Sequence, residues 1–226
     1  MFPKYFIYFI LFLHSSIAFA SDTSFQDATK SYNFIKLKAG IIKPTPLERN
    51  TGLNVGNTTY TTGFTLGRKF YDLLSLDLEY MYRAENTAKN TAPNDYNNSY
   101  SWKAKSNTMM LNLSVDVMQD SKITPYIRGG IGLSKNNASN YLATINGKTR
   151  YYPGRNSNNF AWQIGSGINF RTTEKASFDI EYMFIDRGTI KTRTYYINVK
   201  GKEINSSAIK GNFYDHILTI GFKFKL

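Results

Sequence analysis

The last eleven residues of the chain, His216–Leu226, alternate between apolar and polar side chains. One parity carries bulky apolar groups and the other carries small or charged groups: Leu218, Ile220, Phe222, Phe224 and Leu226 against Thr219, Gly221, Lys223 and Lys225. Successive side chains of a β-strand point to opposite faces, so this segment predicts a strand with one apolar and one polar face. A chain made of such strands must place each apolar row against a protein core or against hydrocarbon.

Seven earlier segments show the same period of two, and no segment shows a competing helical period. They lie at residues 35–41, 60–67, 74–82, 109–117, 126–133, 160–170 and 176–184. Together with the last segment they predict an all-β fold, an eight-stranded antiparallel up-and-down barrel.

The connections between these segments alternate in length. Three are short, at residues 71–73, 118–122 and 171–175, and four are long, at residues 43–59, 83–105, 134–159 and 186–212. Short turns at one end and long loops at the other are typical of a transmembrane barrel with periplasmic turns and extracellular loops. The sequence therefore predicts four long extracellular loops.

The polar face of the expected strands carries glycines and charges of both signs. A soluble barrel of the lipocalin type would turn this face to water, whereas a membrane barrel would turn it inward. Because eight strands enclose space only for side chains, we expect the charges to fill the lumen as ion pairs rather than to form a gated ion path. The expected interior ion-pair residues are Lys36, Lys38, Asp77, Glu79, Asp116, Arg128, Asp179, Glu181 and Lys223.

The N-terminus resembles a secretory signal peptide. Lys4 precedes the apolar run Tyr5–Leu13, and Ala18-Phe19-Ala20 has the small-x-small form of a cleavage site. We expect residues 1–20 to be a signal peptide and residues 21–226 to be an outer-membrane barrel domain. No later run approaches the ~20 apolar residues of a membrane helix.

The sequence offers little for catalysis or metal binding. The chain has no cysteine, which excludes disulfides and thiolate ligands, and His216 is the only histidine left after removal of the signal peptide. A lipid-modifying barrel enzyme would have to use His216. We expect no catalytic residue, no metal and no cofactor.

The long loops are basic, in a chain whose formal charge is +12. Residues 134–159 carry four cations and no acid, and residues 186–212 carry six cations and two acids, so each has a net charge of +4. Tyrosines lie among the cations, as in protein contact surfaces. The candidate ligand-binding residues are Lys148, Arg150, Tyr151, Tyr152, Arg155, Lys191, Arg193, Tyr195, Lys200 and Lys202.

Two readings of these basic loops remain open. They are either a solvated surface attracted to lipopolysaccharide phosphates or a surface that binds acidic host ligands, such as sulfated glycans or acidic protein segments. An outer-membrane location excludes nucleic acid as a partner. Ile145-Asn146-Gly147-Lys148 and Val199-Lys200-Gly201-Lys202 each place a turn between alternating runs, which predicts two β-hairpins.

Three stretches, Asn159–Phe170, Phe178–Gly188 and Tyr214–Phe224, resemble the OmpA-like, opacity-type eight-stranded barrels. Within that family the chain is most similar to small basic surface barrels of rickettsial bacteria, some of them described as adhesins. Members usually end on an aromatic residue, whereas this chain ends on Leu226.

The resemblance implies a surface antigen or adhesin that binds host proteins, while the basic loops add acidic glycans as candidate ligands. We expect a monomeric outer-membrane barrel in contact with outer-membrane lipid and lipopolysaccharide, inserted by the barrel-assembly machinery. The alternatives are a structural barrel without a dedicated ligand and, third, a lipid-modifying enzyme.

Overall fold

The computed structural model describes residues 31–44, 58–71, 73–91, 99–117 and 122–226. These residues belong to one compact unit, Ser31–Leu226. The expected signal peptide and the greater part of the loop at residues 43–59 lie outside the described residues.

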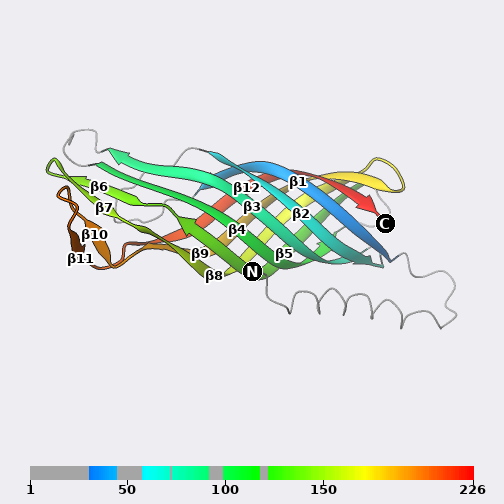
Figure 1. Cartoon of the computed structure of the whole chain (residues 1–226). Helices are drawn as coiled ribbons and strands as arrows, with labels where there is room; N and C mark the ends of the chain where they lie inside the picture. Colours follow the sequence, from blue (N-terminus) through cyan, green and yellow to red (C-terminus); the bar gives the residue numbers. More distant parts are fainter. Residues whose placement is uncertain (1–30, 45–57, 72, 92–98, 118–121) are drawn as a thin grey trace. The chain divides into compact units, whose positions relative to one another are not determined.

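Eight antiparallel strands close into a ring (Figure 1). In ring order they are β1 (Tyr32–Pro44), β2 (Thr59–Phe70), β3 (Leu74–Thr91), β4 (Ser99–Asp116), β5 (Ile123–Ala138), β8 (Gly154–Arg171), β9 (Ala176–Thr192) and β12 (Lys210–Lys225). β1 pairs with β12 from Phe34–Lys225 to Pro44–Asp215, so no strand of the ring is left with a free edge. The predicted antiparallel eight-strand ring is confirmed.

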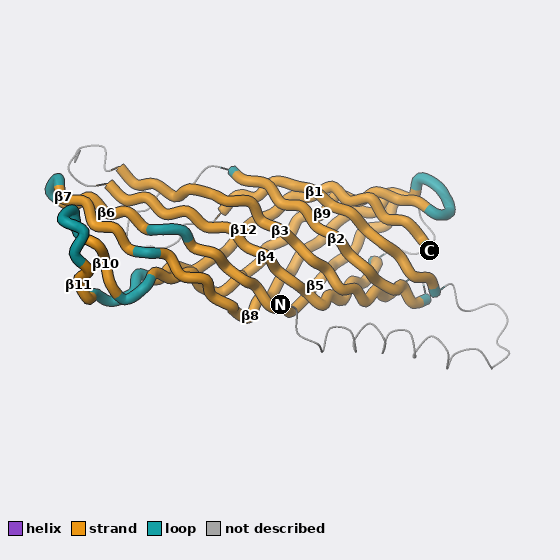
Figure 2. Tube along the Cα trace, viewed as in Figure 1, coloured by secondary structure: helices purple, strands orange, loops and turns teal. Residues whose placement is uncertain are grey.

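Four short strands lie outside the ring at the end where the long connections are found. β6 (Tyr141–Ile145) pairs with β7 (Lys148–Tyr152), and β10 (Tyr195–Ile197) pairs with β11 (Glu203–Asn205). β6 also pairs with β4, and β7 with β10, so the two hairpins extend the sheet beyond the ring. Figure 2 shows that strands make up nearly all of the described chain.

Several ring strands are longer than the sequence pattern predicted. The expected loop at residues 83–105 is largely strand, because β3 continues to Thr91 and β4 begins at Ser99. Similarly, β5, β8, β9 and β12 extend into the expected loops at residues 134–159 and 186–212. The alternation fades there because the outer face of these extensions is polar, although backbone pairing continues.

The ring has an apolar outer face and a polar inner face, which is the reverse of a soluble barrel. Apolar side chains point outward and remain exposed, as at Ile131 (58%) and Leu133 (68%), whereas Glu79 in the interior is 0% exposed. An aliphatic outer wall of this kind is stable only against hydrocarbon. The described residues contain no helix that is long and apolar enough to cross a bilayer.

Ile131→Lys tests whether this wall faces lipid. A lysine on a lipid-facing wall costs up to about 2–4 kcal/mol of unfolding free energy, whereas most exposed positions in water tolerate it within about 0.5 kcal/mol. We expect the larger loss in denaturant unfolding of the barrel in lipid vesicles. Asn158→Lys, on the exposed polar part of β8, is the control and is expected to be near neutral.

Candidate functional site

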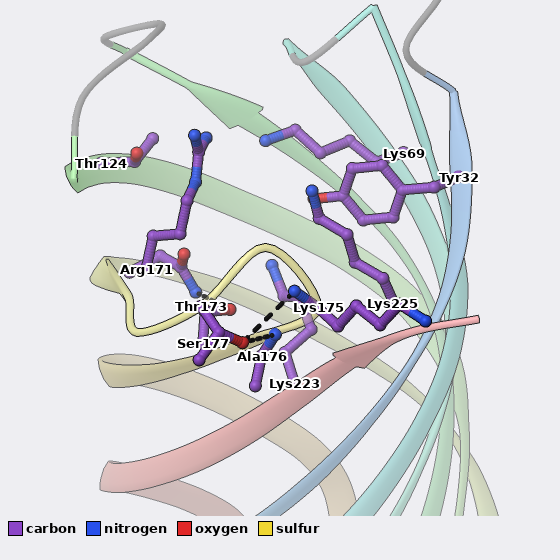
Figure 3. Close-up of a pocket in the computed structure, with 11 residues that line it drawn as sticks. Tyr32, Lys69, Thr124, Arg171, Thr173, Lys175, Ala176, Ser177, Lys223 and Lys225 are labelled. Atoms are coloured by element: carbon purple, nitrogen blue, oxygen red, sulfur yellow. Dashed lines mark hydrogen bonds between the residues drawn. The ribbon is translucent and has the colours of Figure 1, made fainter.

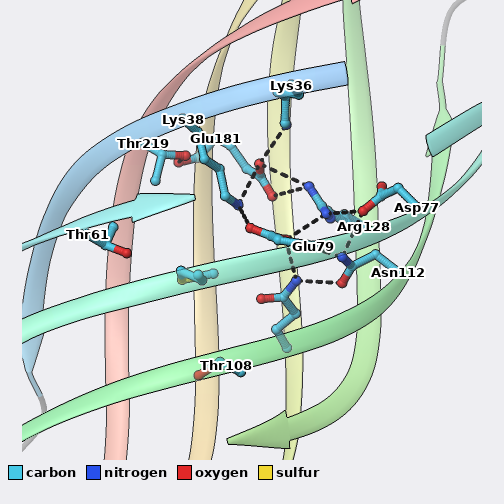
Figure 4. Close-up of polar contacts among 12 residues, drawn as sticks. Lys36, Lys38, Thr61, Asp77, Glu79, Thr108, Asn112, Arg128, Glu181 and Thr219 are labelled. Carbon is cyan, nitrogen blue, oxygen red and sulfur yellow. Dashed lines mark hydrogen bonds and ion pairs between the residues drawn. The ribbon is translucent and has the colours of Figure 1, made fainter. Parts of the chain in front are cut away.

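Arg128 on β5 lies at the centre of a buried network of charges in the lumen (Figure 4). Its Nη2 atom contacts Asp77 Oδ1 at 2.6 Å and Glu79 Oε2 at 2.7 Å, and its Nη1 atom lies 3.4 Å from Glu181 Oε2. Arg128 thus joins β3 to β9 across the lumen, which a single guanidinium can do because it carries several donors in one plane.

Two lysines of β1 complete the ionic part of this network. Lys36 Nζ lies 2.7 Å from Asp179 and 3.2 Å from Glu181, while Lys38 Nζ contacts Glu79 and lies 3.8 Å from Glu181. Three cations therefore face four carboxylates in the interior. Because all seven are almost fully buried, each charge depends on its partners to offset the loss of water.

Neutral side chains satisfy further oxygens of the same carboxylates. Asn112 donates to Asp77 at 2.9 Å and to Glu79 at 3.2 Å. Gln163 donates to Glu79 at 3.3 Å, and the Tyr126 hydroxyl donates to Asp179 at 2.5 Å. We call these ten residues the lumen network: Lys36, Lys38, Asp77, Glu79, Asn112, Tyr126, Arg128, Gln163, Asp179 and Glu181.

Glycines make room for the lumen network. A Cβ at Gly130 would lie 2.0 Å from Asn112 Oδ1, and a Cβ at Gly221 would lie 2.1 Å from Asp179 Oδ1. The space left by each glycine is therefore occupied by a polar side chain of the neighbouring strand. The glycines on the polar face are part of the interior packing.

The inward side chains of β9 pass through successive layers of the lumen. Asp179 and Glu181 belong to the lumen network, Met183 and Ile185 are buried in an apolar layer, and Arg187 follows. The sequence did not predict the apolar layer, which consists of Ile42, Met81, Met183, Ile185 and Ile217. Their side chains point into the lumen from strand segments whose outward-pointing side chains are also apolar. The sequence there does not alternate between apolar and polar residues, so it gave no indication of which residues point inward.

A second buried ion cluster lies beyond the apolar layer. Arg83 Nε and Arg187 Nε both lie 2.9 Å from Asp215 Oδ2, and Arg187 also donates to Thr108. From its position in the sequence Arg187 was expected among the loop cations, which is wrong because its side chain is fully buried. Arg83 is also stacked over Phe213 at 4.4 Å.

Two of the expected interior residues lie apart from the lumen network. Lys69 Nζ lies 2.5 Å from Asp116, which gives Asp116 a separate ion pair. Lys223 is half-buried and lies over the Phe34 ring at 5.0 Å. Within the described part of the chain, no carboxylate lies within 4.0 Å of the Lys223 ammonium.

The loop-side strands enclose an aromatic core of their own, which we call the aromatic cap. Its buried members are Trp102, Ala104, Ala138, Tyr141, Ala143, Tyr152, Ile190 and Phe213. Tyr141 contacts both Trp102 and Tyr152 edge to face, at 5.5 and 5.8 Å between ring centroids. Tyr152 is only 7% exposed, so its assignment as a ligand-contact residue is corrected: its ring packs inside the cap.

The two hairpins hold most of the remaining candidates. Asn146 and Gly147 have φ angles of 50° and 72°, as a type I′ turn requires, and place Lys148 at an exposed position. Arg150 lies over Tyr196 at 5.2 Å. Half-buried Tyr151 pairs with Leu142 and Ile197, and half-buried Tyr195 pairs with Asn205.

The second hairpin turn holds two exposed lysines. The backbone amides of Lys200 and Lys202 donate to Asn198 Oδ1 at 2.9 and 3.0 Å, and Gly201 has a φ of 75°. Their ammonium groups are therefore carried by an ordered turn.

Three cations lie side by side on neighbouring strands of the loop-side wall. Arg155 on β8 is the cross-strand partner of Lys191 on β9, and Lys191 is the partner of Lys210 on β12. Directly opposed side chains of an antiparallel pair have Cβ atoms about 4.5–5.5 Å apart, and like charges there are destabilising. We call these three residues the cation row; exposed Arg193 follows two residues after Lys191. Lys210 is not among the candidates predicted from the sequence, because the register between strands cannot be read from one strand alone.

His216 lies on the outer wall, away from the cation row. Its Nδ1 atom is 2.7 Å from the Tyr182 hydroxyl, and the two rings are stacked. The described residues contain no group of three histidine, cysteine or carboxylate side chains that could hold a metal ion.

Residues 9–202 match a family model described as outer membrane protein beta-barrel domain. The chain belongs to this family of outer-membrane β-barrels. The candidate adhesin RC1281 of Rickettsia conorii is 27% identical over 95% of this chain and 90% of its own length. The outer membrane protein PagN of Salmonella typhimurium is 26% identical over 57% of each chain.

The crystal structure of the outer membrane protein OprG from Pseudomonas aeruginosa has the same fold. It superposes with a TM-score of 0.53 over 86% of this chain and 97% of that chain, at 15% identity. The location of this barrel is the bacterial outer membrane.

Gly130→Ala tests the packing of the lumen network in this outer-membrane barrel. The added methyl group would displace Asn112, and overpacking of this kind costs about 1–3 kcal/mol of unfolding free energy. The neighbouring Gly129→Ala is a matched control, since the nearest atom to its Cβ is 3.9 Å away, and should change stability by under about 0.5 kcal/mol. Equal stability of the two variants in denaturant unfolding would contradict the packing described here.

The filled lumen predicts that the barrel does not conduct ions. The lumen network, the apolar layer and the Arg83–Asp215–Arg187 cluster follow one another along the barrel, and a layer of buried apolar side chains opposes ion passage. Planar-bilayer recordings of the refolded protein should show no discrete openings, with a porin reconstituted in the same way as the control. Stepwise, voltage-dependent currents would instead support a gated ion path.

Proposed function

We propose that this outer-membrane barrel is an adhesin whose loop-side cations bind acidic groups on a host surface. The observation that carries the proposal is the cation row. Arg155, Lys191 and Lys210 are placed next to one another by strand register, and none of them has an acidic partner within 4.0 Å in the described chain.

Such a row opposes folding unless an anion is bound there. Like charges on neighbouring strands repel, whereas a sulfate, phosphate or carboxylate group placed between them would receive several charge-assisted hydrogen bonds. Arg193, Lys148, Lys200 and Lys202 add positive charge at the same end of the barrel, which increases the rate of encounter with an acidic surface.

The aromatic cap supports the proposal because it packs two of the three cation-bearing strands, β9 and β12, into a buried core. Ile190 and Phe213 are buried in the cap, close in sequence to Lys191 and Lys210. A binding surface that is already ordered loses less conformational entropy when it meets its ligand. Tyrosines of the loops thus act mainly in support of the cations, with Tyr151 and Tyr195 still partly accessible.

The proposal includes an orientation for the barrel. The short connections would face the periplasm, and the extended strands and hairpins would face the outside of the cell. Residues 1–20 would direct export, and the barrel-assembly machinery would insert a monomer. The similarity to the candidate adhesin RC1281, over nearly the whole of both chains, supports the proposal that this barrel is an adhesin.

A catalytic function is not part of the proposal. His216, the histidine available after export, stacks on Tyr182 at the outer wall instead of facing a cleft. We infer that His216 lies with Tyr182 at the boundary between the hydrocarbon core and water, where aromatic residues are common in membrane barrels.

Charge reversal of the cation row tests the proposal. The triple variant Arg155→Glu, Lys191→Glu and Lys210→Glu should reduce binding of barrel-coated beads to host cells about tenfold or more, because attraction is replaced by repulsion. Addition of a sulfated glycan or an acidic peptide as competitor then identifies the class of ligand.

The matched control reverses three other exposed loop-side cations, Lys103, Lys105 and Lys135 on β4 and β5. Both triple variants change the net charge equally, and heat-modifiable gel mobility verifies that both are folded. Undiminished binding by the cation-row variant would show that the row is not the adhesive surface. An equal loss in both variants would favour a structural barrel whose cations serve only general attraction to lipopolysaccharide.

A further inference from the structure

Among the described residues, cations dominate the turn-side mouth of the lumen, at the opposite end from the cation row. Five basic residues line a hollow there: Lys69, Arg171, Lys175, Lys223 and Lys225 (Figure 3). We call this set the basic mouth. It is formed where β2, β8 and β12 end and where the turn before β9 crosses the opening.

The described carboxylates neutralise the basic mouth only in part. Asp116 pairs with Lys69, and Asp179 is engaged by Lys36 and Tyr126 in the lumen network. Glu174 lies in the exposed turn next to Lys175, yet no carboxylate of the described residues lies within 4.0 Å of Arg171, Lys175 or Lys223. This contrasts with the lumen network, where three cations already face four carboxylates.

Neutral hydrogen-bonding groups lie among these cations. Thr124 and Thr173 line the hollow, and Asn169 donates to the Ser177 hydroxyl at 3.1 Å. Thr173 Oγ1 accepts from the amides of Lys175 and Ala176 at 3.3 and 2.9 Å, which orders the turn that carries Lys175. A hollow lined by guanidinium, ammonium and hydroxyl groups suits a tetrahedral oxyanion with several acceptors.

We propose that the basic mouth binds a small phosphate-bearing anion. The ligand would lie in the hollow lined by Arg171, Lys175 and Lys223, which have no acidic partner within 4.0 Å in the described chain, while Lys69 adds charge beside Asp116. A dissolved phosphate compound fits the geometry better than a lipid headgroup, because Lys69 and Lys223 have the inward parity of their strands and the headgroups surround the outer wall.

Calorimetric titration of the full barrel in zwitterionic detergent, at low salt, tests this site with inorganic phosphate and with pyrophosphate. We expect saturable binding that is tighter for pyrophosphate, and about tenfold weaker in each of Arg171→Gln and Lys223→Gln because a charge-assisted contact is lost. Lys175→Gln changes only an exposed turn residue, so it tests the site without disturbing the wall. Lys223→Arg should retain binding.

Lys200→Gln is the matched control, since it removes one exposed cation at the far end of the barrel. Absence of saturable binding, or an equal loss in this control, would overturn the proposal. A parallel titration with phosphatidylglycerol vesicles separates the two sources of phosphate. Binding of the vesicles with the same variant dependence, but of neither soluble anion, would assign the site to a lipid headgroup. The adhesion assay is independent of all these outcomes because it tests cations at the other end.

Discussion

The contact of Arg128 with Asp77, Glu79 and Glu181 is the interaction on which the barrel depends most. An eight-stranded ring is too narrow for water to solvate seven buried charges, so every charge must find its counterpart from another strand. Six strands contribute to the lumen network, while β2 and β12 supply Gly63 and Gly221 at close approaches to Lys38 and Asp179. The register between strands, the positions of the glycines and the positions of the charges therefore depend on one another, because a change in one would separate the buried charges from their partners.

This constraint also explains why the two ends of the barrel can differ. The lumen network and the apolar layer close the middle of the barrel, so neither end needs to participate in sealing it. The loop end uses its inward positions for the aromatic cap and presents cations outward, whereas the turn end directs cations into the opening. Because the middle of the barrel is closed, its two ends carry separate basic surfaces, and a different ligand is proposed for each.

The aromatic cap changes the interpretation of the loop tyrosines. Tyrosines among cations suggested a contact surface, but Tyr141 packs against both Tyr152 and Trp102 inside the extended strands. The same sequence pattern serves recognition or packing according to which side of the strand faces the lumen. Since β6 and β7 are joined to β4 through backbone pairing, their inward side chains continue the interior of the ring instead of facing solvent.

The local sequence pattern by itself determined the eight strands of the ring, which residues share a face, and where the Asn146–Gly147 turn lies, because these properties depend on neighbours in the sequence. It could not determine how far β3 and β4 extend into polar segments, or that Ile217 and Arg187 are interior, because their surroundings are supplied by distant strands. The alignment of Arg155, Lys191 and Lys210 likewise exists only once β8, β9 and β12 are in register. Local periodicity sets the faces of each strand, whereas the partner that each charge meets is decided by closure of the ring.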